Sequence, residues 1–329
     1  MNNGSRRPFL PTRRSYNRHP MAKRRNDFID RALYIGLRLF AAMLHVRPIE
    51  TNLSLMRRVG SLVYFVDRRH RRRAQANLRY SFPHMSEAHR NRLARHSLQQ
   101  LAMLCAEVLF TTRLIRIDTW RRYVELKNFR ETLELLMARR QGLIMLTGHY
   151  GNWEILGYVL ATLGFQTTTV ARPLDNPYVS EFVYGMRTRR GQRIVDKTGA
   201  MSQIAEELAH GGVVCFVADQ NAGSKGLFVN FFGRPASTYK SIALLAIEYN
   251  VPIVVGYARR MDKSFRFQIS AQDIIYPADW KDRPDAVMYI TQRYTSAIEA
   301  FVREDPSQYL WIHRRWKSRP KDEPPGLYA

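Results

Sequence analysis

The sequence predicts an α/β fold with a mixed, mostly parallel sheet flanked by helices, preceded by a helical N-terminal region. Two observations predict this fold class. From about residue 141 onward, short apolar runs alternate with segments of helical period, which is the pattern of successive strands and helices. Before that point, apolar residues recur mainly at helical spacing. We therefore expect a helical region over residues 28–140 and an α/β core over residues 141–316.

The two ends of the chain carry a different composition. Residues 1–25 contain eight Lys and Arg residues and no acidic residue, so we expect residues 1–27 to form a disordered basic arm. Residues 317–329 are rich in proline and predict a tail that runs over the surface.

The first apolar segment, residues 28–46, contains Asp30, Arg31 and Arg38. A membrane-spanning helix needs about 20 mostly apolar residues and rarely tolerates a central arginine. The segment therefore indicates an amphipathic helix in the membrane interface, where Arg31, Arg38 and Arg47 could reach lipid phosphates. The alternatives are an ordinary helix packed on the core and, less favoured, a single span.

The remaining elements follow from period and punctuation. Helices are expected over residues 52–65 and 86–110, and one or two helices over residues 119–138. In the core, strands are expected at residues 143–147, 166–171, 194–195, 213–218, 227–232, 251–259 and 265–270. Helices are expected between them at residues 153–163, 177–190, 201–210 and 238–250, and finally at residues 285–303.

The most informative stretch is residues 143–154. An uncharged apolar strand ends at Gly148, offers His149, breaks again at Gly151, and reaches Asn152 and Glu154 as a new helix begins. Asn152 is a plausible N-cap. Residues five apart on one helix point away from each other, so His149 and Glu154 can meet only if the chain bends at Gly151.

A carboxylate that accepts one imidazole N–H leaves the other ring nitrogen free to act as a base. No Ser or Cys lies beside His149, so the pair predicts deprotonation of a substrate hydroxyl by His149, with Glu154 as its orienting partner. The alternative is that His149 and Glu154 merely satisfy each other at a strand end. Backbone N–H groups near Gly151 or Asn152 could stabilise an oxyanion.

Other polar residues follow predicted strands, where α/β sheets present their sites. Arg172 could bind a phosphate, and Asp219, beside Gln220, could support His149. Lys225 lies in a glycine-containing loop, and Arg234 precedes a predicted helix start at which an anion could bind. Each of these residues could instead be an ordinary capping or surface residue.

Several of these segments together resemble the bacterial lipid A late acyltransferases of the lysophospholipid acyltransferase superfamily. They are residues 147–154, 171–173, 218–220 and 231–235, together with the terminal segment 311–317. The resemblance covers roughly residue 28 to the C-terminus. The third block reads Ala-Asp-Gln and not Pro-Glu-Gly, which makes glycerol 3-phosphate a less favoured acceptor.

The resemblance implies a glycerolipid acyltransferase-like core on the cytoplasmic face of the inner membrane, attached peripherally or shallowly through the N-terminal helix. It implies transfer of a fatty acyl chain from acyl carrier protein, or from acyl-CoA, to a hydroxyl of a phosphorylated glycolipid. His149, Glu154 and Asp219 would then be catalytic. Arg172 would contact a substrate phosphate. The other expected substrate-binding residues follow from their positions in the sequence, and they are Asn152, Gln220, Arg234 and Lys225.

Composition bears on the remaining alternatives. The formal net charge of +24 favours anionic partners, namely a phospholipid surface, an acidic protein or a nucleic acid. A nucleic-acid site needs aromatic residues among its cations, and the arginine cluster at residues 68–73 has few, so no nucleic-acid partner is expected. Neither a metal nor a cofactor is expected, because His and Cys lack ligand spacing. An acyltransferase acting on another glycolipid, such as a mannosylated phosphatidylinositol, remains open.

Overall fold

A seven-stranded sheet forms the centre of the computed structural model, which describes residues 26–138, 140–171, 173–189, 191–196 and 199–321. The strand order is β1-β9-β8-β2-β5-β3-β4, and only β8 and β9 pair antiparallel within this sheet. The predicted mixed, mostly parallel sheet is therefore confirmed. The strands are β1 (Val124–Lys127), β2 (Leu143–Thr147), β3 (Thr167–Ala171), β4 (Arg193–Asp196), β5 (Val213–Val217), β8 (Ile253–Arg260) and β9 (Phe267–Ile275).

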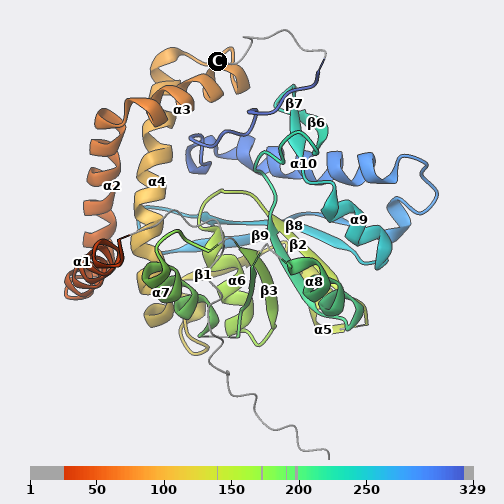
Figure 1. The fold of residues 1–329 in the computed structure, drawn as a ribbon, viewed down its shortest axis with the longest axis horizontal. Helices are drawn as coiled ribbons and strands as arrows, with labels where there is room; N and C mark the ends of the chain where they lie inside the picture. Colours follow the sequence, from red (N-terminus) through yellow and green to blue (C-terminus); the bar gives the residue numbers. More distant parts are fainter. Residues whose placement is uncertain (1–25, 139, 172, 190, 197–198, 322–329) are drawn as a thin grey trace, which may run out of the picture.

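Helices cover both faces of the sheet, and successive residues of β2 face different helices. Met145 belongs to a core shared with α5, α6 and α7, whereas Leu146 belongs to a second core shared with α8, α9 and α10. Figure 1 shows α10 running across one face. The helices are α5 (Arg130–Ala138), α6 (Trp153–Thr162), α7 (Pro177–Thr188), α8 (Ala200–Ala209), α9 (Ser241–Glu248) and α10 (Ala286–Glu304).

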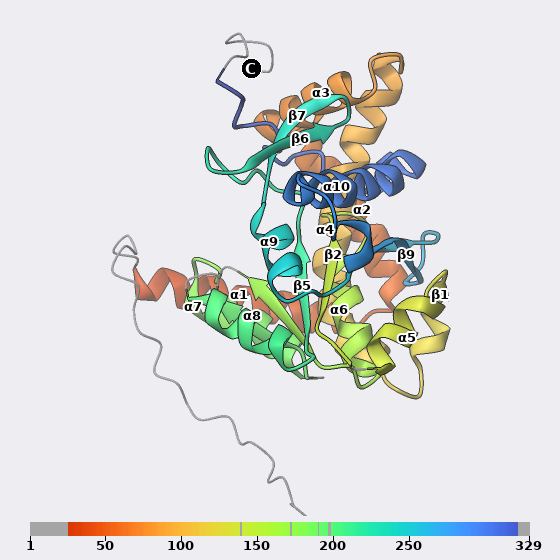
Figure 2. The ribbon, with the colours of Figure 1, turned by 90° about the vertical axis from the view of Figure 1, so that its right-hand side faces the viewer.

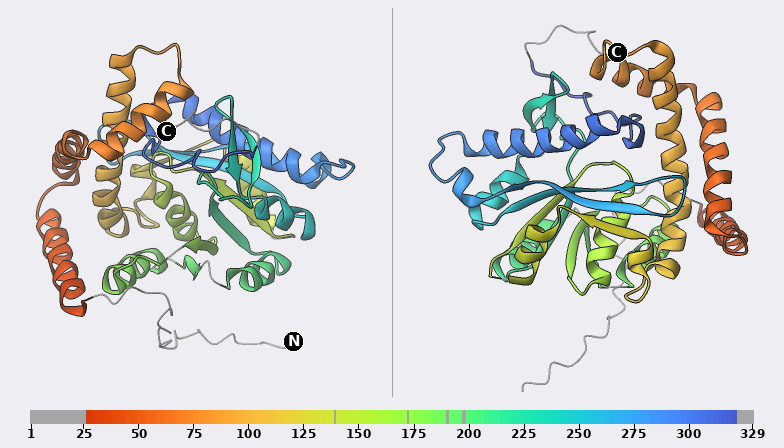
Figure 3. Two further views of the ribbon diagram at one scale, coloured as in Figure 1. Left: turned by 45° about the horizontal axis from the view of Figure 1, so that its top comes forward. Right: turned by 180° about the vertical axis from the view of Figure 1, so that it is seen from behind.

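Four helices precede the sheet: α1 (Asp27–His45), α2 (Ile49–Val66), α3 (Arg68–Ser81) and α4 (Glu87–Leu114). The helix α2 lies alongside the longer α4 at the outer edge of the molecule. The preceding helix, α1, extends from the start of α2 toward α7 (Figure 3). Among the described residues, no helix has the length and hydrophobicity needed to cross a bilayer. The predicted basic arm lies outside the described residues except for its last two positions.

The prediction of one or two helices over residues 119–138 is wrong in its first half. A 3-10 turn at Trp120–Arg122 leads into β1, and α5 follows. Val124 pairs with Phe267 of β9, and Asn128 adopts a φ of 50°, which ends the strand. The apolar spacing of the segment fits a helix, but a partner strand from the end of the chain provides the hydrogen bonds of a sheet edge.

A hairpin replaces the predicted helix start at Thr238. Strands β6 (Leu227–Phe231) and β7 (Arg234–Thr238) pair antiparallel around Phe232 and Gly233, whose φ angles are 57° and 74°. Two successive positive φ values are typical of a tight hairpin turn. Figure 2 shows this hairpin beside α3, beyond α10. The following helix, α9, begins at Ser241.

Candidate active site

The site is built on the turn that follows β2, whose five residues are all buried. Gly148, His149, Tyr150 and Gly151 form the turn, and Asn152 caps α6 by accepting a hydrogen bond from the Ile155 N–H at 3.1 Å. Gly151 has a φ of 57°, and a Cβ atom there would lie 2.0 Å from the carbonyl oxygen of Ala258. Glycine is therefore required at this bend, as predicted from the sequence.

Backbone hydrogen bonds from two distant segments hold the turn. The Asn152 N–H donates to the Ala258 carbonyl of β8 at 2.8 Å. The C-terminal segment supplies the rest: Gly151 N–H donates to Gln308 at 3.0 Å, and Leu310 N–H donates to the carbonyl of His149 at 3.0 Å. The N–H groups of Gly151 and Asn152 thus already donate within the protein, so in this arrangement they are not available to an oxyanion.

The partner of the His149 ring is Asp219. The Oδ1 atom of Asp219 lies 2.6 Å from Nδ1 of the imidazole, and its Oδ2 atom accepts the backbone N–H of His149 at 2.8 Å. Burial would raise the pKa of the Asp219 carboxyl, but the charge of His149 and its hydrogen bonds outweigh this effect and hold the pKa below its ordinary value. An ionised Asp219 requires the proton on Nδ1, which leaves Nε2 as the basic nitrogen.

Glu154 does not meet the ring, which corrects the predicted His149–Glu154 pair. Its carboxylate instead binds Arg187 of α7 in a bidentate ion pair, with N···O distances of 2.8 and 2.5 Å. The reason is geometric: Glu154 lies in the first turn of α6 and projects toward α7, while His149 lies before the bend.

Asn152 is also corrected as a substrate-binding residue, because its side chain is fully buried and hydrogen-bonded inside the protein. Its Nδ2 group donates to Glu107 at 2.8 Å, and Glu107 is fully buried in α4. Arg260, at the end of β8, binds the same carboxylate through two hydrogen bonds of 2.7 Å. This buried network fixes the start of α6 below the His149 turn.

Three side chains surround the exposed side of the His149 ring. The Gln220 amide nitrogen lies 3.3 Å from Nε2, where a neutral imidazole accepts a hydrogen bond. The rings of Trp153 and His313 pack edge to face on the imidazole, with centroids 4.9 and 4.3 Å away. Burial, and then the charge of His149, lower the pKa of His313 to about 4, so this second histidine is neutral at neutral pH.

His149 lines an apolar pocket of about 790 Å³. This volume lies in the range of small-molecule sites. His149, Gln220, Glu154 and Arg187 contribute its polar groups near the turn, and apolar side chains from the carboxyl half of β2, β3 and β5 form much of the rest. The pocket thus lies where parallel strands of α/β sheets present their sites.

Two of the remaining predicted residues do not line this pocket. Lys225 is exposed in the loop before β6. Arg234 is buried in β7 between the rings of Tyr80 and Trp316, at 4.4 and 4.6 Å from their centroids, so the predicted anion site at this position is wrong. The predicted phosphate contact at Arg172 lies outside the described residues.

Sequence reasoning missed four contributors to the site. Arg187 and His313 have no local pattern that marks them, although His313 lies in the terminal segment that carries the resemblance. The sequence does mark Glu107, because a single acidic residue in an apolar stretch indicates a buried charge that needs a partner. Arg260, at the end of a strand, is that partner. Within the described residues, no cluster of three or more His, Cys, Asp or Glu side chains could hold a metal ion.

Comparison with known proteins places this chain in a family. The chain matches the model of the bacterial lipid A biosynthesis acyltransferases over residues 23–318. A lipid A biosynthesis acyltransferase of Haemophilus influenzae is 23% identical over 295 residues, which cover 88% of this chain and 89% of the relative. The lipid A biosynthesis lauroyltransferase of Escherichia coli is 24% identical over 272 residues, or 81% of this chain and 85% of the relative.

A relative with a different acceptor in its name also matches. The phosphatidylinositol mannoside acyltransferase of Mycobacterium tuberculosis is 24% identical over 188 residues, which cover 56% of this chain and 57% of the relative. The family match spans the helices α1 to α4, the sheet and the His149 turn. The chain therefore belongs to the bacterial lipid A biosynthesis acyltransferase family and is an acyltransferase.

Proposed function

We propose that this protein is a membrane-associated O-acyltransferase that moves a fatty acyl chain from acyl carrier protein, or from acyl-CoA, to a hydroxyl of a lipid A precursor. One observation carries the proposal: His149, whose ring is held by Asp219, lines an apolar pocket of about 790 Å³. A base beside an apolar pocket suits a reaction between an alcohol and a long-chain thioester.

In the proposed reaction, Nε2 of His149 accepts the proton of the acceptor hydroxyl as its oxygen attacks the thioester carbonyl. The tetrahedral intermediate collapses with cleavage of the C–S bond, and the imidazolium returns the proton to the leaving thiolate. Asp219 orients the ring and stabilises the imidazolium. We propose that the Gln220 amide, 3.3 Å from Nε2, turns to donate to the oxyanion. Glu154 and Arg187 line the same pocket and form part of its polar wall.

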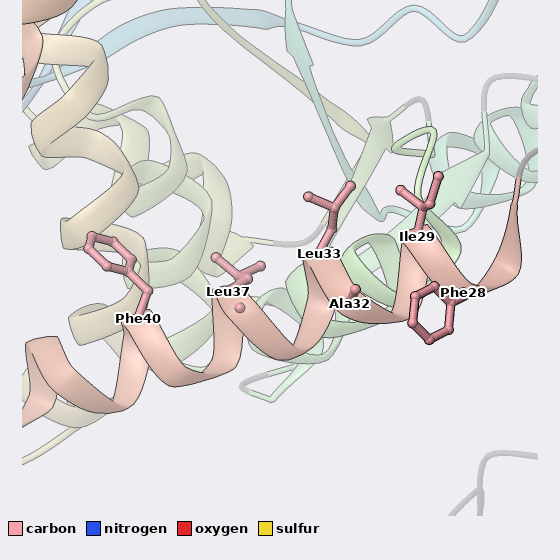
Figure 4. A pocket seen from close by; sticks show the side chains of 7 residues that line it. Phe28, Ile29, Ala32, Leu33, Leu37 and Phe40 are labelled. Carbon is pink, nitrogen blue, oxygen red and sulfur yellow. The ribbon is translucent and has the colours of Figure 1, made fainter.

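The apolar surface of α1 and α2 supports attachment to a bilayer. Figure 4 shows Ile29, Leu33 and Leu37 at successive turns along one side of α1. Leu39 of α1 and Leu62 of α2 are 67% and 63% exposed, so these helices present large side chains that the protein itself does not cover. Arg31 and Arg38, expected to reach phosphates, contact α7 through Tyr178 and Phe182. We propose that the apolar surface docks peripherally on the cytoplasmic face of the inner membrane.

Transfer to another glycolipid is the second candidate, because the Mycobacterium tuberculosis relative is named for a mannosylated phosphatidylinositol. The two candidates share the donor chemistry and the base, and differ only in the acceptor. The resemblance in the terminal segment and the breadth of the lipid A family match favour the lipid A precursor.

An acceptor panel tests the proposal. Purified full-length protein is incubated with acyl carrier protein thioesters or acyl-CoA, and with a lipid A precursor, a phosphatidylinositol mannoside or a lysophospholipid. Mass spectrometry of the products should show an added acyl chain on the lipid A precursor, and none with His149→Ala. Acylation confined to the mannoside would support the second candidate. Acylation of none of the acceptors by the wild-type protein would refute the assignment.

A further inference from the structure

Away from His149, the wall of the pocket includes a row of residues from three neighbouring strands. Across the sheet, Met145 of β2, Cys215 of β5 and Thr169 of β3 form one row, and all three line the pocket. This row lies two residues before the end of β2. At the rise of a strand, it is therefore about 7 Å farther from the turn that carries His149 than the end of β2 is.

A buried amide faces the pocket at this depth. Gln192 lies just before β4 and is 7% exposed, and its Nε2 group donates to Oγ1 of Thr169 at 2.9 Å. Because β4 runs parallel to β2, the start of β4 lies at the end of the sheet away from His149. Gln192 therefore places a fixed polar group deep in a pocket whose surrounding wall includes Leu160 and Val183.

A glycine beside Gln192 lets the amide take this position. Gly157 lies in α6, four residues after Trp153, or about 6 Å along the helix axis. A Cβ atom at Gly157 would lie 2.5 Å from Nε2 of Gln192, so any larger residue must displace the amide. Gly157 and Gln192 thus contact each other in the wall of the pocket.

We propose that Gln192, held by Thr169 and packed against Gly157, limits the length of the acyl chain that the enzyme transfers. The proposal rests on the acyl-transfer function proposed above. A saturated chain with its thioester at His149 extends along α6 toward the amide. A chain that is too long must either bury its end against the amide or break the hydrogen bond to Thr169, and both are unfavourable.

Two substitutions at this contact should act in opposite directions. Gln192→Ala removes the amide and opens space, so the preferred donor should become longer. Gly157→Ala adds a methyl group and displaces the amide, so the preferred donor should become shorter. One methylene group in a hydrophobic pocket changes specificity by roughly tenfold or more, and we expect ratios between neighbouring donors to shift by about tenfold.

The experiment uses the full-length protein and a mixture of saturated acyl carrier protein thioesters that differ in steps of two carbons. Mass spectrometry of the acylated acceptor gives the distribution of transferred chains. Gln99→Ala is a matched control. Gln99 is a buried glutamine on α4, away from the pocket, and it donates to Ser61 of α2 at 2.7 Å. Gly185→Ala is the second control, since a Cβ atom there meets nothing within 4 Å.

Opposite shifts in the two variants, with neither control shifting, support the proposal. Active variants with the wild-type chain distribution overturn it and leave the acyl-transfer function standing. Absence of any transfer by the wild-type protein would instead refute that function. If Gln192→Ala fails to fold, as judged by thermal unfolding, Gly157→Ala alone decides: alanine favours a helix over glycine, so this variant should fold.

Discussion

Asp219 binds His149 twice, through the ring Nδ1 at 2.6 Å and through the backbone N–H at 2.8 Å. The two residues are 70 positions apart in sequence but follow neighbouring strands, β2 and β5, which pair in register from Leu143 with Val213 to Thr147 with Val217. The carboxylate therefore fixes both the position of the turn and the tautomer of the ring. Among the described residues, no other contact in the site fixes both the position of the turn and the tautomer of the ring.

Substitution of Asp219 by Asn should lower kcat by about 10²-fold or more, the typical contribution of a positioned base. An asparagine amide can donate to Nδ1 and so favours the tautomer with its proton on Nε2, which removes the base. The rate is measured as a function of pH with saturating acceptor. Glu154→Gln is the comparison, because Glu154 does not contact the ring and its substitution should leave the pH profile unchanged. Wild-type turnover in Asp219→Asn would contradict the assignment.

The Glu154–Arg187 ion pair should couple the stability of α6 to that of α7. Both side chains are about one-fifth exposed, so removal of one partner leaves a mostly buried charge. We expect Glu154→Ala and Arg187→Ala each to lower the free energy of unfolding by about 1–3 kcal/mol, with the double variant less destabilised than the sum. Urea unfolding of the four proteins measures the coupling. Strict additivity would show that the pair does not interact.

Glu107→Ala should destabilise the protein more than Glu154→Ala or Arg187→Ala, because it leaves the guanidinium of Arg260 buried without its carboxylate partner. The side chains of Arg260 and Glu107 are 2% and 0% exposed. Breaking such a pair costs about 3–5 kcal/mol. Thermal unfolding should show the loss, and substitution of both residues by apolar side chains, Glu107→Leu with Arg260→Met, should recover part of it. A loss below about 1 kcal/mol would argue against this network as the anchor of α6.

Stability should decrease as the pH falls from about 6.5 to about 4 because of His313. Its pKa is lowered to about 4 in the folded protein, so over this interval the unfolded chain binds more protons, and acid favours unfolding. The shift corresponds to at most roughly 3 kcal/mol. His313→Phe keeps a ring beside His149 but cannot titrate, so the variant should lose less stability over this interval. An identical slope in both proteins would exclude His313 as the cause.

The exposed apolar surface of α1 and α2 should drive binding to lipid vesicles. Leu39→Glu and Leu62→Glu replace side chains that are mostly exposed, so thermal unfolding should be unchanged, while vesicle binding weakens by about tenfold or more for each. Met137→Glu on α5 is the control, because Met137 is 72% exposed on a different helix. Equal loss of binding in all three variants would indicate a general charge effect and not a docking surface.

The features of the site that depend on neighbouring residues in the chain could be predicted from the sequence. The uncharged run before Gly148, the second glycine and the Asn152 cap all depend on neighbouring residues, and the structure contains the strand, the bend and the helix start. Asp219 was placed at the same edge of the sheet because parallel strands end together. The choice between two carboxylates was beyond the sequence, since it depends on the direction in which the first turn of α6 faces.

Contacts between distant segments explain the other differences. The partner of Glu154 lies on α7, 33 residues away, and the partner of Glu107 lies 153 residues away on β8. The strand β1 has a helical apolar spacing and becomes a strand only because β9 lies beside it. In each case a contact between distant segments decides the outcome, and the neighbouring residues in the sequence do not reveal it.

The two backbone hydrogen bonds that join the His149 turn to Gln308 and Leu310 have a consequence for assembly of the active site. Their partners lie more than 150 residues apart in the sequence, on either side of most of the α/β core. The turn therefore acquires these hydrogen bonds only after the core has folded. A chain that has formed the strand, the bend and the helix locally would still lack a fixed base.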